Sequence, residues 1–111
     1  MILITGPMWS GKRSLAMQLL NCDEAALETR CACDVQRLAA QREDLAVLAE
    51  ELSRYEVVTA AELGGGVVPV DPQERAAREH AGRLACLLAE RADTVIRVFC
   101  GIPKVIKGEW K

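Results

Sequence analysis

The sequence predicts an α/β fold, a small and mostly parallel sheet of three or four strands with flanking helices. Short β-branched runs alternate with longer segments in which apolar residues recur at helical spacing, a pattern typical of parallel sheets. The 111 residues have the length of one modest domain, covering 1–111. Half of the residues are hydrophobic but only 4% are aromatic, so the core must come from Ala, Leu and Val.

The first elements are a strand and a helix separated by a glycine-rich turn. Ile2–Thr5 is a β-branched run that ends at a glycine, as a buried strand does. From Gly11 onward Leu15 and Leu19 fall on one helical face, and the helix is expected to close over 21–23. The next stretch, 23–30, is ambiguous between a loop and a short helical piece.

A long helix is predicted from Asp34, which suits an N-cap, to about Arg54. A second strand follows at Tyr55–Ala60, and two prolines predict an extended segment over 67–72. The remaining predicted elements are a third helix from about Gln73 to Arg91, a third strand at Thr94–Cys100 and a short fourth strand at Lys104–Lys107.

The turn after the first strand carries a phosphate-loop motif. Gly6 to Lys12 read G-P-M-W-S-G-K, which is Gly-x-x-x-x-Gly-Lys in the strand–loop–helix context that gives the motif its meaning. The glycines allow N–H groups to turn inward, the helix start adds unpaired amides, and the lysine adds a cation. The predicted nucleotide-binding residues are Gly6, Pro7, Met8, Trp9, Ser10, Gly11, Lys12, Arg13 and Ser14.

One position departs from the motif. A Ser or Thr normally follows the lysine and holds Mg²⁺, but here Arg13 stands there and the serine comes one residue later. Because a residue along a helix is a rotation of about 100°, Ser14 is expected to point away from the phosphates. In one interpretation, Arg13 lies outward and the metal is bound weakly or through water. In the other, the charge of Arg13 replaces the metal, and phosphoryl transfer is slow. No protein metal site is predicted.

Other candidate residues have two interpretations each. Glu62 follows the second strand, where an acidic group could assist catalysis beside Lys12, or it is a solvated turn residue. Trp9 could stack on a base, cover the loop or make a subunit contact. His80 is expected to be an ordinary helix residue, and the pair Cys31 and Cys33 lacks the second pair that zinc would need. Arg75, Arg78 and Arg83 either approach phosphates or form a solvated helix face.

The composition indicates which classes of partner and which cellular compartment to expect. A net charge of −2 and a pI of about 5.4 give no electrostatic footprint for nucleic acid. No apolar run approaches the roughly 20 residues of a membrane span. Five cysteines without a secretory segment are expected as reduced thiols in a cytoplasmic protein. The Ala/Leu-rich helices offer flat faces for a neighbouring copy, so a homo-oligomer is expected.

Both ends of the chain resemble one family. Glu62 to Pro69 read E-L-G-G-G-V-V-P, Gly101 to Lys107 read G-I-P-K-V-I-K, and the chain starts MILITGPMWSGKR. These stretches, with Arg75, Arg78, the A-G-R that ends at Arg83 and the A-D that follows the third helix, resemble the adenosylcobinamide kinase / adenosylcobinamide-phosphate guanylyltransferase family. The resemblance covers roughly two thirds of the chain.

This resemblance implies a P-loop NTPase-like fold, ATP or GTP as donor, a corrinoid acceptor and a role in cobalamin assembly. Family members phosphorylate the hydroxyl of adenosylcobinamide and then transfer GMP through a guanylylated histidine. They are longer, and the segment that carries that histidine is missing here between the first helix and Asp34. Arg13, Ala61 and Ala85 stand where the family usually has Ser, Asn and Asn. The chain therefore resembles a shortened, divergent member for which guanylyltransfer is not expected.

Two hypotheses follow. In the first, the chain is a kinase-type phosphotransferase in which Lys12 and the loop amides hold the nucleotide and Glu62 assists. In the second, it is a catalytically silent module that binds a nucleotide or a corrinoid, or serves as a subunit of an assembly.

Overall fold

The computed structural model describes residues 1–62 and 71–109. In chain order its elements are β1 (Ile2–Gly6), α1 (Lys12–Leu20), α2 (Glu24–Arg30), β2 (Cys31–Ala32), α3 (Gln36–Ala39), α4 (Leu45–Leu52), β3 (Val57–Ala61), α5 (Pro72–Arg91), β4 (Thr94–Phe99) and β5 (Ile102–Lys107). None of the described helices combines the length and the apolar character needed to cross a membrane.

The strands form one sheet in the order β2-β3-β1-β4-β5. The strands β2, β3, β1 and β4 run parallel, whereas β5 returns antiparallel against β4. The mostly parallel α/β sheet that the sequence predicts is confirmed, with one strand more than the three or four expected. The carboxyl ends of the parallel strands meet at one edge, where ligand crevices of such sheets lie.

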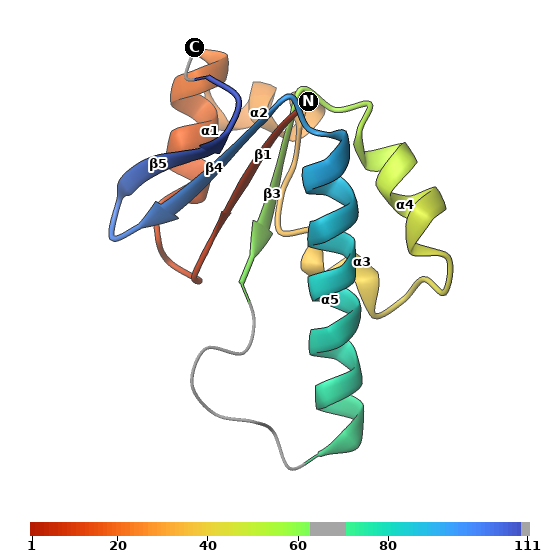
Figure 1. Ribbon diagram of the computed structural model, residues 1–111. Helices are drawn as coiled ribbons and strands as arrows, with labels where there is room; N and C mark the ends of the chain where they lie inside the picture. Colours follow the sequence, from red (N-terminus) through yellow and green to blue (C-terminus); the bar gives the residue numbers. More distant parts are fainter. Residues whose placement is uncertain (63–70, 110–111) are drawn as a thin grey trace.

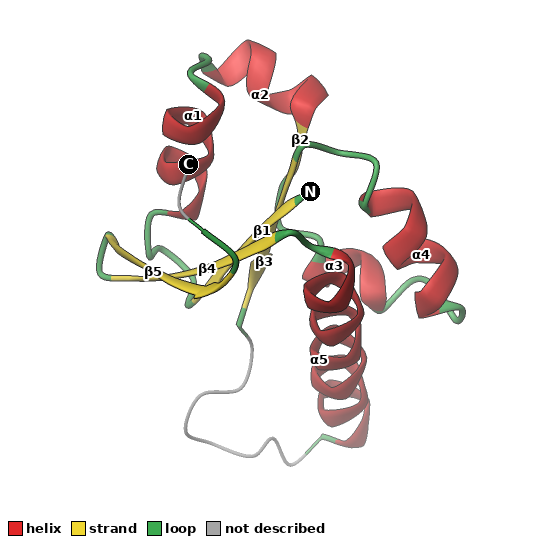
Figure 2. Cartoon of the chain, turned by 45° about the horizontal axis from the view of Figure 1, so that its top comes forward, coloured by secondary structure: helices red, strands yellow, loops and turns green. Residues whose placement is uncertain are grey.

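Helices cover both faces of the sheet. The helices α1 and α2 lie on one face, and α3, α4 and α5 on the other (Figures 1 and 2). Leu3 and Ile4 show how this follows from strand geometry, because successive side chains point to opposite faces. Leu3 packs in the cluster under α4 and α5, and Ile4 packs in the cluster under α1 and α2.

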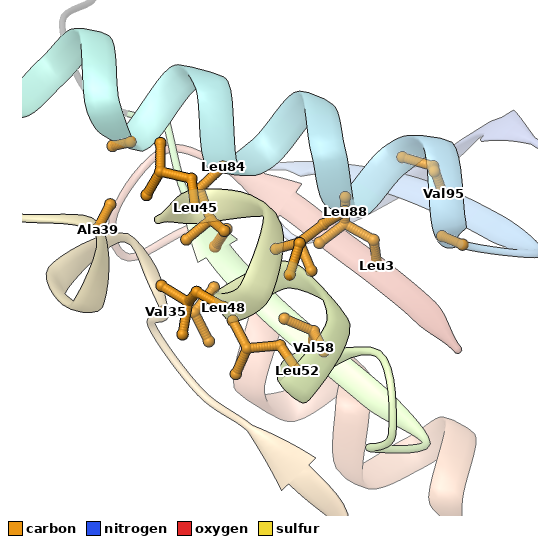
Figure 3. Close-up of a cluster of buried hydrophobic side chains, with 14 residues drawn as sticks. Leu3, Val35, Ala39, Leu45, Leu48, Leu52, Val58, Leu84, Leu88 and Val95 are labelled. Carbon is orange, nitrogen blue, oxygen red and sulfur yellow. The ribbon is translucent and has the colours of Figure 1, made fainter. Parts of the chain in front are cut away.

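The larger of the two clusters is built almost entirely from Leu, Val and Ala, as the composition predicts. Figure 3 shows Leu84 and Leu88 of α5 and Leu45, Leu48 and Leu52 of α4 meeting Leu3, Val58 and Val95 of the sheet. Leu84 and Leu88 are almost fully buried. This packing holds β1, β3 and β4 in place.

Local capping explains several helix boundaries. The side chain of Asp23 accepts a hydrogen bond from the N–H of Ala26, so the ambiguous stretch 23–30 contains the helix α2. The helix α1 ends at Asn21, whose left-handed conformation (φ 50°) turns the chain away. The third helix is confirmed, capped by Asp71 and continuing to Arg91.

The single long helix predicted from Asp34 to about Arg54 is wrong. Two shorter helices, α3 and α4, occupy this region, with a break between them. At the start, the N–H groups of Asp34 and Val35 bind Thr59 of β3, and Asp34 has φ 54°, so it cannot begin a helix. At the break, the carboxylate of Asp44 accepts from the N–H of Val47 and caps α4 separately.

Smaller corrections concern segment ends. The second predicted strand begins two residues later than expected, as β3. Pro72 was expected to lie in an extended segment but is the first residue of α5, where a proline costs no hydrogen bond. The predicted extended segment over 67–70 and the glycines 64–66 lie outside the described residues. The strand β2 was not predicted, because two residues carry no readable pattern.

Candidate phosphate-binding site

The glycine-rich segment between β1 and α1 lies at the carboxyl edge of the sheet, and its glycines are required by geometry. A Cβ at Gly6, which has φ 152°, would lie 2.2 Å from the carbonyl oxygen of Val98. Gly11 has φ 99° and starts α1, and the N–H of Gly101 donates to Ser10 O at 2.9 Å. A larger residue would clash at Gly6 and be strained at Gly11, so the conformation of the turn requires both glycines.

The start of α1 offers unpaired backbone donors. Gly11 is the N-cap and has no side chain that could bind the first-turn amides. The N–H of Leu15 is the one that donates back to Gly11 O, at 3.1 Å. The amides that precede Leu15 therefore lie before the intrahelical ladder begins, at the positive end of the helix dipole.

The side chain of Lys12 is only 6% exposed and lies over the loop. Its Nζ donates to Pro7 O at 2.6 Å and to Ser10 Oγ at 3.4 Å. Burial lowers the pKa of Lys12, and the negative charges of Asp34 and Glu62 oppose this lowering. The ammonium group is thus inside the loop, with two carboxylates near enough to influence it.

A cleft of about 370 Å³ opens beside this loop. It is lined by Trp9, Ser10, Gly11, Lys12, Arg13, Ser14, Cys33, Asp34 and Thr59. Of the predicted nucleotide-binding residues, six line the cleft, whereas Gly6, Pro7 and Met8 shape the loop beneath or beside it. Trp9 is 95% exposed with φ 63°, so its indole does not plug the cleft.

Arg13 and Ser14 are both at the cleft. The side chain of Arg13 is 46% exposed, and its Nε lies 3.9 Å from a carboxylate oxygen of Glu24. Ser14 also lines the cleft, because both residues belong to the first turn of α1. That its hydroxyl turns away from bound phosphates stays a prediction.

Asp34 completes the far wall of the cleft, and the sequence did not identify it as a site residue. It follows β2 with a left-handed backbone, and its N–H donates to Thr59 Oγ1 at 2.9 Å. The guanidinium of Arg37 lies 3.8 Å from its carboxylate. An acidic residue directly after a strand could have indicated this role, but β2 is too short to be read from sequence.

Glu62 lies at the end of β3, where the sequence placed it, but it is already paired. Its N–H donates to Gly6 O at 2.8 Å, which ties β3 to the loop. Its carboxylate accepts from Nε and Nη2 of Arg97 at 2.7 and 2.9 Å. These bonds lower the pKa of the Glu62 carboxyl, Lys12 contributes to the lowering, and burial opposes it. The guanidinium of Arg97 lies 5.7 Å from the ring centre of Phe99.

Arg97 is a charged residue within a strand, and sequence analysis did not select it. Its partner is 35 residues away, so only the tertiary structure reveals the pair. A bidentate bond to arginine keeps Glu62 ionised and makes it a weak proton acceptor.

The residues present do not fit a protein-held Mg²⁺ site. Within 1–62 and 71–109, no three His, Cys, Asp or Glu side chains gather in a way that could hold a metal ion. The position that usually supplies the hydroxyl ligand is Arg13, a residue with donors only.

The remaining candidates lie away from the cleft. His80 is half-buried on α5, as predicted, and lines a groove with Arg83, Cys86 and Glu43. Arg78 lines a separate cavity of about 180 Å³ that also touches Glu62. Arg75 is exposed near the start of α5. None of the three arginines Arg75, Arg78 and Arg83 lines the cleft at the phosphate loop.

The strand order, the glycine loop after β1 and the helix that follows define a P-loop NTPase-like α/β protein. Residues 25–106 match the profile of the family described as cobinamide kinase / cobinamide phosphate guanyltransferase. The chain is also 35% identical over 92 residues to the bifunctional adenosylcobalamin biosynthesis protein CobP of Pseudomonas aeruginosa. The chain belongs to the cobinamide kinase / cobinamide phosphate guanyltransferase family.

Two features of the match bear on function. The aligned part is 82% of this chain but 53% of the relative, so the chain spans about half of that protein's length. The family match begins at residue 25, after the glycine loop. The match to the family model therefore does not include the loop motif.

The Glu62–Arg97 pair predicts a pH effect. Because the folded-state pKa of Glu62 is lowered, the pair stabilises the fold fully above the carboxyl's ordinary pKa, and this contribution is lost as pH falls through the lowered value. Arg97→Gln should raise the pKa of Glu62 toward its ordinary value in a carbon-13 NMR titration of that carboxyl.

The accompanying loss of stability should be small, since both side chains are about 40% exposed. Urea unfolding should show it at neutral pH, and it should vanish in acid. Arg91→Gln, at the exposed end of α5, is the matched control. A Glu62 titration that Arg97→Gln leaves unchanged would show that the pair does not set this pKa.

Proposed function

We propose that the chain binds a nucleoside triphosphate, ATP or GTP, with its phosphates in the cleft at the glycine loop, and that it acts at the cobinamide kinase step of cobalamin biosynthesis. The observation that carries the proposal is the geometry of residues 6–14. Two conformationally required glycines, an uncapped helix start and a buried lysine converge beside one cleft. That combination suits a polyanion and little else.

Each residue would have a defined task. The amides of the first turn of α1 and the ammonium of Lys12 bind phosphate oxygens, for which Lys12 leaves its contact with Pro7 O. Arg13 can swing from Glu24 toward the phosphates, because its side chain is half-exposed and held by a contact of 3.9 Å. Trp9 lies beside the cleft, fully accessible to a base.

The acceptor would be an alcohol of a corrinoid, in keeping with the cobinamide kinase activity for which the family is named. Glu62 is an acidic residue tied to the loop by its N–H bond to Gly6 O. While Arg97 holds its carboxylate, it is a poor base for that alcohol. Slow phosphoryl transfer is the expected result.

A catalytically silent nucleotide- or corrinoid-binding module is the second candidate function. Two features favour it: Arg13 stands in place of the hydroxyl, and the ionised carboxylate of Glu62 is held by Arg97. Guanylyltransfer through a histidine finds no support, because His80 lines the groove on α5 and not the cleft. A homo-oligomer is part of either proposal, since Phe99, Ile102 and Ile106 of β4 and β5 leave apolar surface exposed.

Removing the ammonium group tests the site. Lys12→Ala should weaken ATP and GTP binding at least about tenfold, because a buried charge-assisted contact to phosphate is lost. Isothermal titration calorimetry, with and without Mg²⁺, measures this. Lys104→Ala, an exposed lysine on β5, controls for a general loss of positive charge. Equal nucleotide affinity of Lys12→Ala and wild type would show that the glycine loop is not the binding site.

Restoring the missing hydroxyl separates the two candidate functions. Wild type should show negligible ATPase activity. Arg13→Ser should raise Mg²⁺-dependent ATPase if the site is an altered kinase site, measured as phosphate release with Lys12→Ala/Arg13→Ser as the blank. Turnover that stays at the blank level in Arg13→Ser would favour the silent module.

A further inference from the structure

Two cysteines lie in contact at the end of β2. The thiol of Cys33 donates to Sγ of Cys31 at a sulfur–sulfur distance of 3.6 Å, and both are free. Cys31 is buried between α2 and β3, whereas Cys33 is half-buried and lines the cleft at the phosphate loop. The pair thus has one sulfur that the cleft exposes and one that the core protects.

The backbone brings this pair close to disulfide geometry. Side chains two residues apart in an extended strand point to the same side, with Cα atoms about 6.6 Å apart. Disulfides span Cα separations of about 4.4–6.8 Å and have an S–S bond of about 2.05 Å. A modest contraction of the Cys31-Ala-Cys33 segment would close the bond, and the short strand β2 sits at the edge of the sheet, where contraction disturbs one neighbour only.

We propose that Cys31 and Cys33 are a reversible thiol–disulfide site whose oxidant is a low-molecular-weight disulfide, and that closing it alters the adjoining phosphate cleft. The second half of this inference rests on the proposed function; the first half does not.

The exchange proceeds in two balanced steps. Cys33 loses its proton to solvent and attacks one sulfur of the small disulfide, whose S–S bond breaks; the displaced thiolate leaves and takes up a proton. Cys31 then loses its proton and attacks Sγ of Cys33, which releases the second small thiol. Two protein thiols are oxidised and one small disulfide is reduced to two thiols.

The order of attack follows from the surroundings. Cys33 is reached from the cleft, while Cys31 is about 97% covered. Burial raises the pKa of the Cys31 thiol and the neighbouring Cys33 adds to this, while Arg13 opposes it. Cys31 is therefore the resolving cysteine, which reacts once a mixed disulfide stands directly beside it.

The cleft is coupled to the pair through the next residue. Asp34 is held by its N–H bond to Thr59 Oγ1 and by a left-handed backbone, and both residues line the cleft. Contraction between Cys31 and Cys33 would pull on the backbone of Asp34. It would shift the carboxylate of Asp34, whose charge reaches Lys12.

The test uses the full chain with Cys22→Ser/Cys86→Ser/Cys100→Ser, so that only the pair remains. After equilibration with oxidised glutathione, trypsin cleavage following Arg30 and Arg37 places both cysteines in one peptide, CACDVQR. This peptide should resist alkylation, weigh two hydrogens less and regain both thiols with reductant. Adding Cys31→Ser should instead trap a stable glutathione adduct on Cys33. Two alkylatable thiols, or an adduct that never resolves with Cys31 present, would overturn the site.

The coupling is measured with inorganic pyrophosphate as the probe. Its affinity for the oxidised chain should be about fivefold weaker or more than for the reduced chain. Cys31→Ser/Cys33→Ser should bind equally with and without oxidant. Equal affinity of oxidised and reduced chain would overturn the coupling. A disulfide that forms in a chain binding no pyrophosphate in either state would instead refute the proposed function and leave the thiol site standing.

Discussion

The close approach of β1's last residue to β4 is the constraint on which the site depends. Gly6 passes the carbonyl of Val98 so closely that a side chain would collide with it, and its own carbonyl accepts the N–H of Glu62. The other end of the loop is fixed by the bond from Gly101 to Ser10 O. These contacts fix the ends of β1, β3 and β4 relative to the glycine loop. They also fix the positions of Lys12 and the start of α1. The leucine-rich packing of α4 and α5 holds the same strands in place.

Two charged residues distinguish this site from an ordinary phosphoryl-transfer site. Glu62 is bound at two points by Arg97, and Arg13 stands at the position of a metal-binding hydroxyl. Under the proposed function, Arg13 adds positive charge for phosphates, whereas the bond to Arg97 weakens Glu62 as a proton acceptor. Both features therefore fit the proposed phosphate binding better than rapid phosphoryl transfer.

Sequence patterns predicted the elements whose own residues determine them. The strand β1, the glycine turn, α1, α5 and β4 each have local periodicity or capping, and each was placed within a few residues. The single long helix from Asp34 failed because Thr59, distant in sequence, holds Asp34 in a left-handed conformation and Asp44 caps a separate helix. Arg97 and Asp34 were missed for the same reason, since only tertiary contacts give them a role.

The proposed function depends on phosphate binding by the backbone at the start of α1, and amide NMR tests this most directly. Nitrogen-15-labelled chain titrated with ADP should show its largest shifts at Gly11, Lys12, Arg13 and Ser14, with the Trp9 indole following if the base stacks there. Saturable shifts confined to the groove on α5, or none at the start of α1, would contradict the central claim.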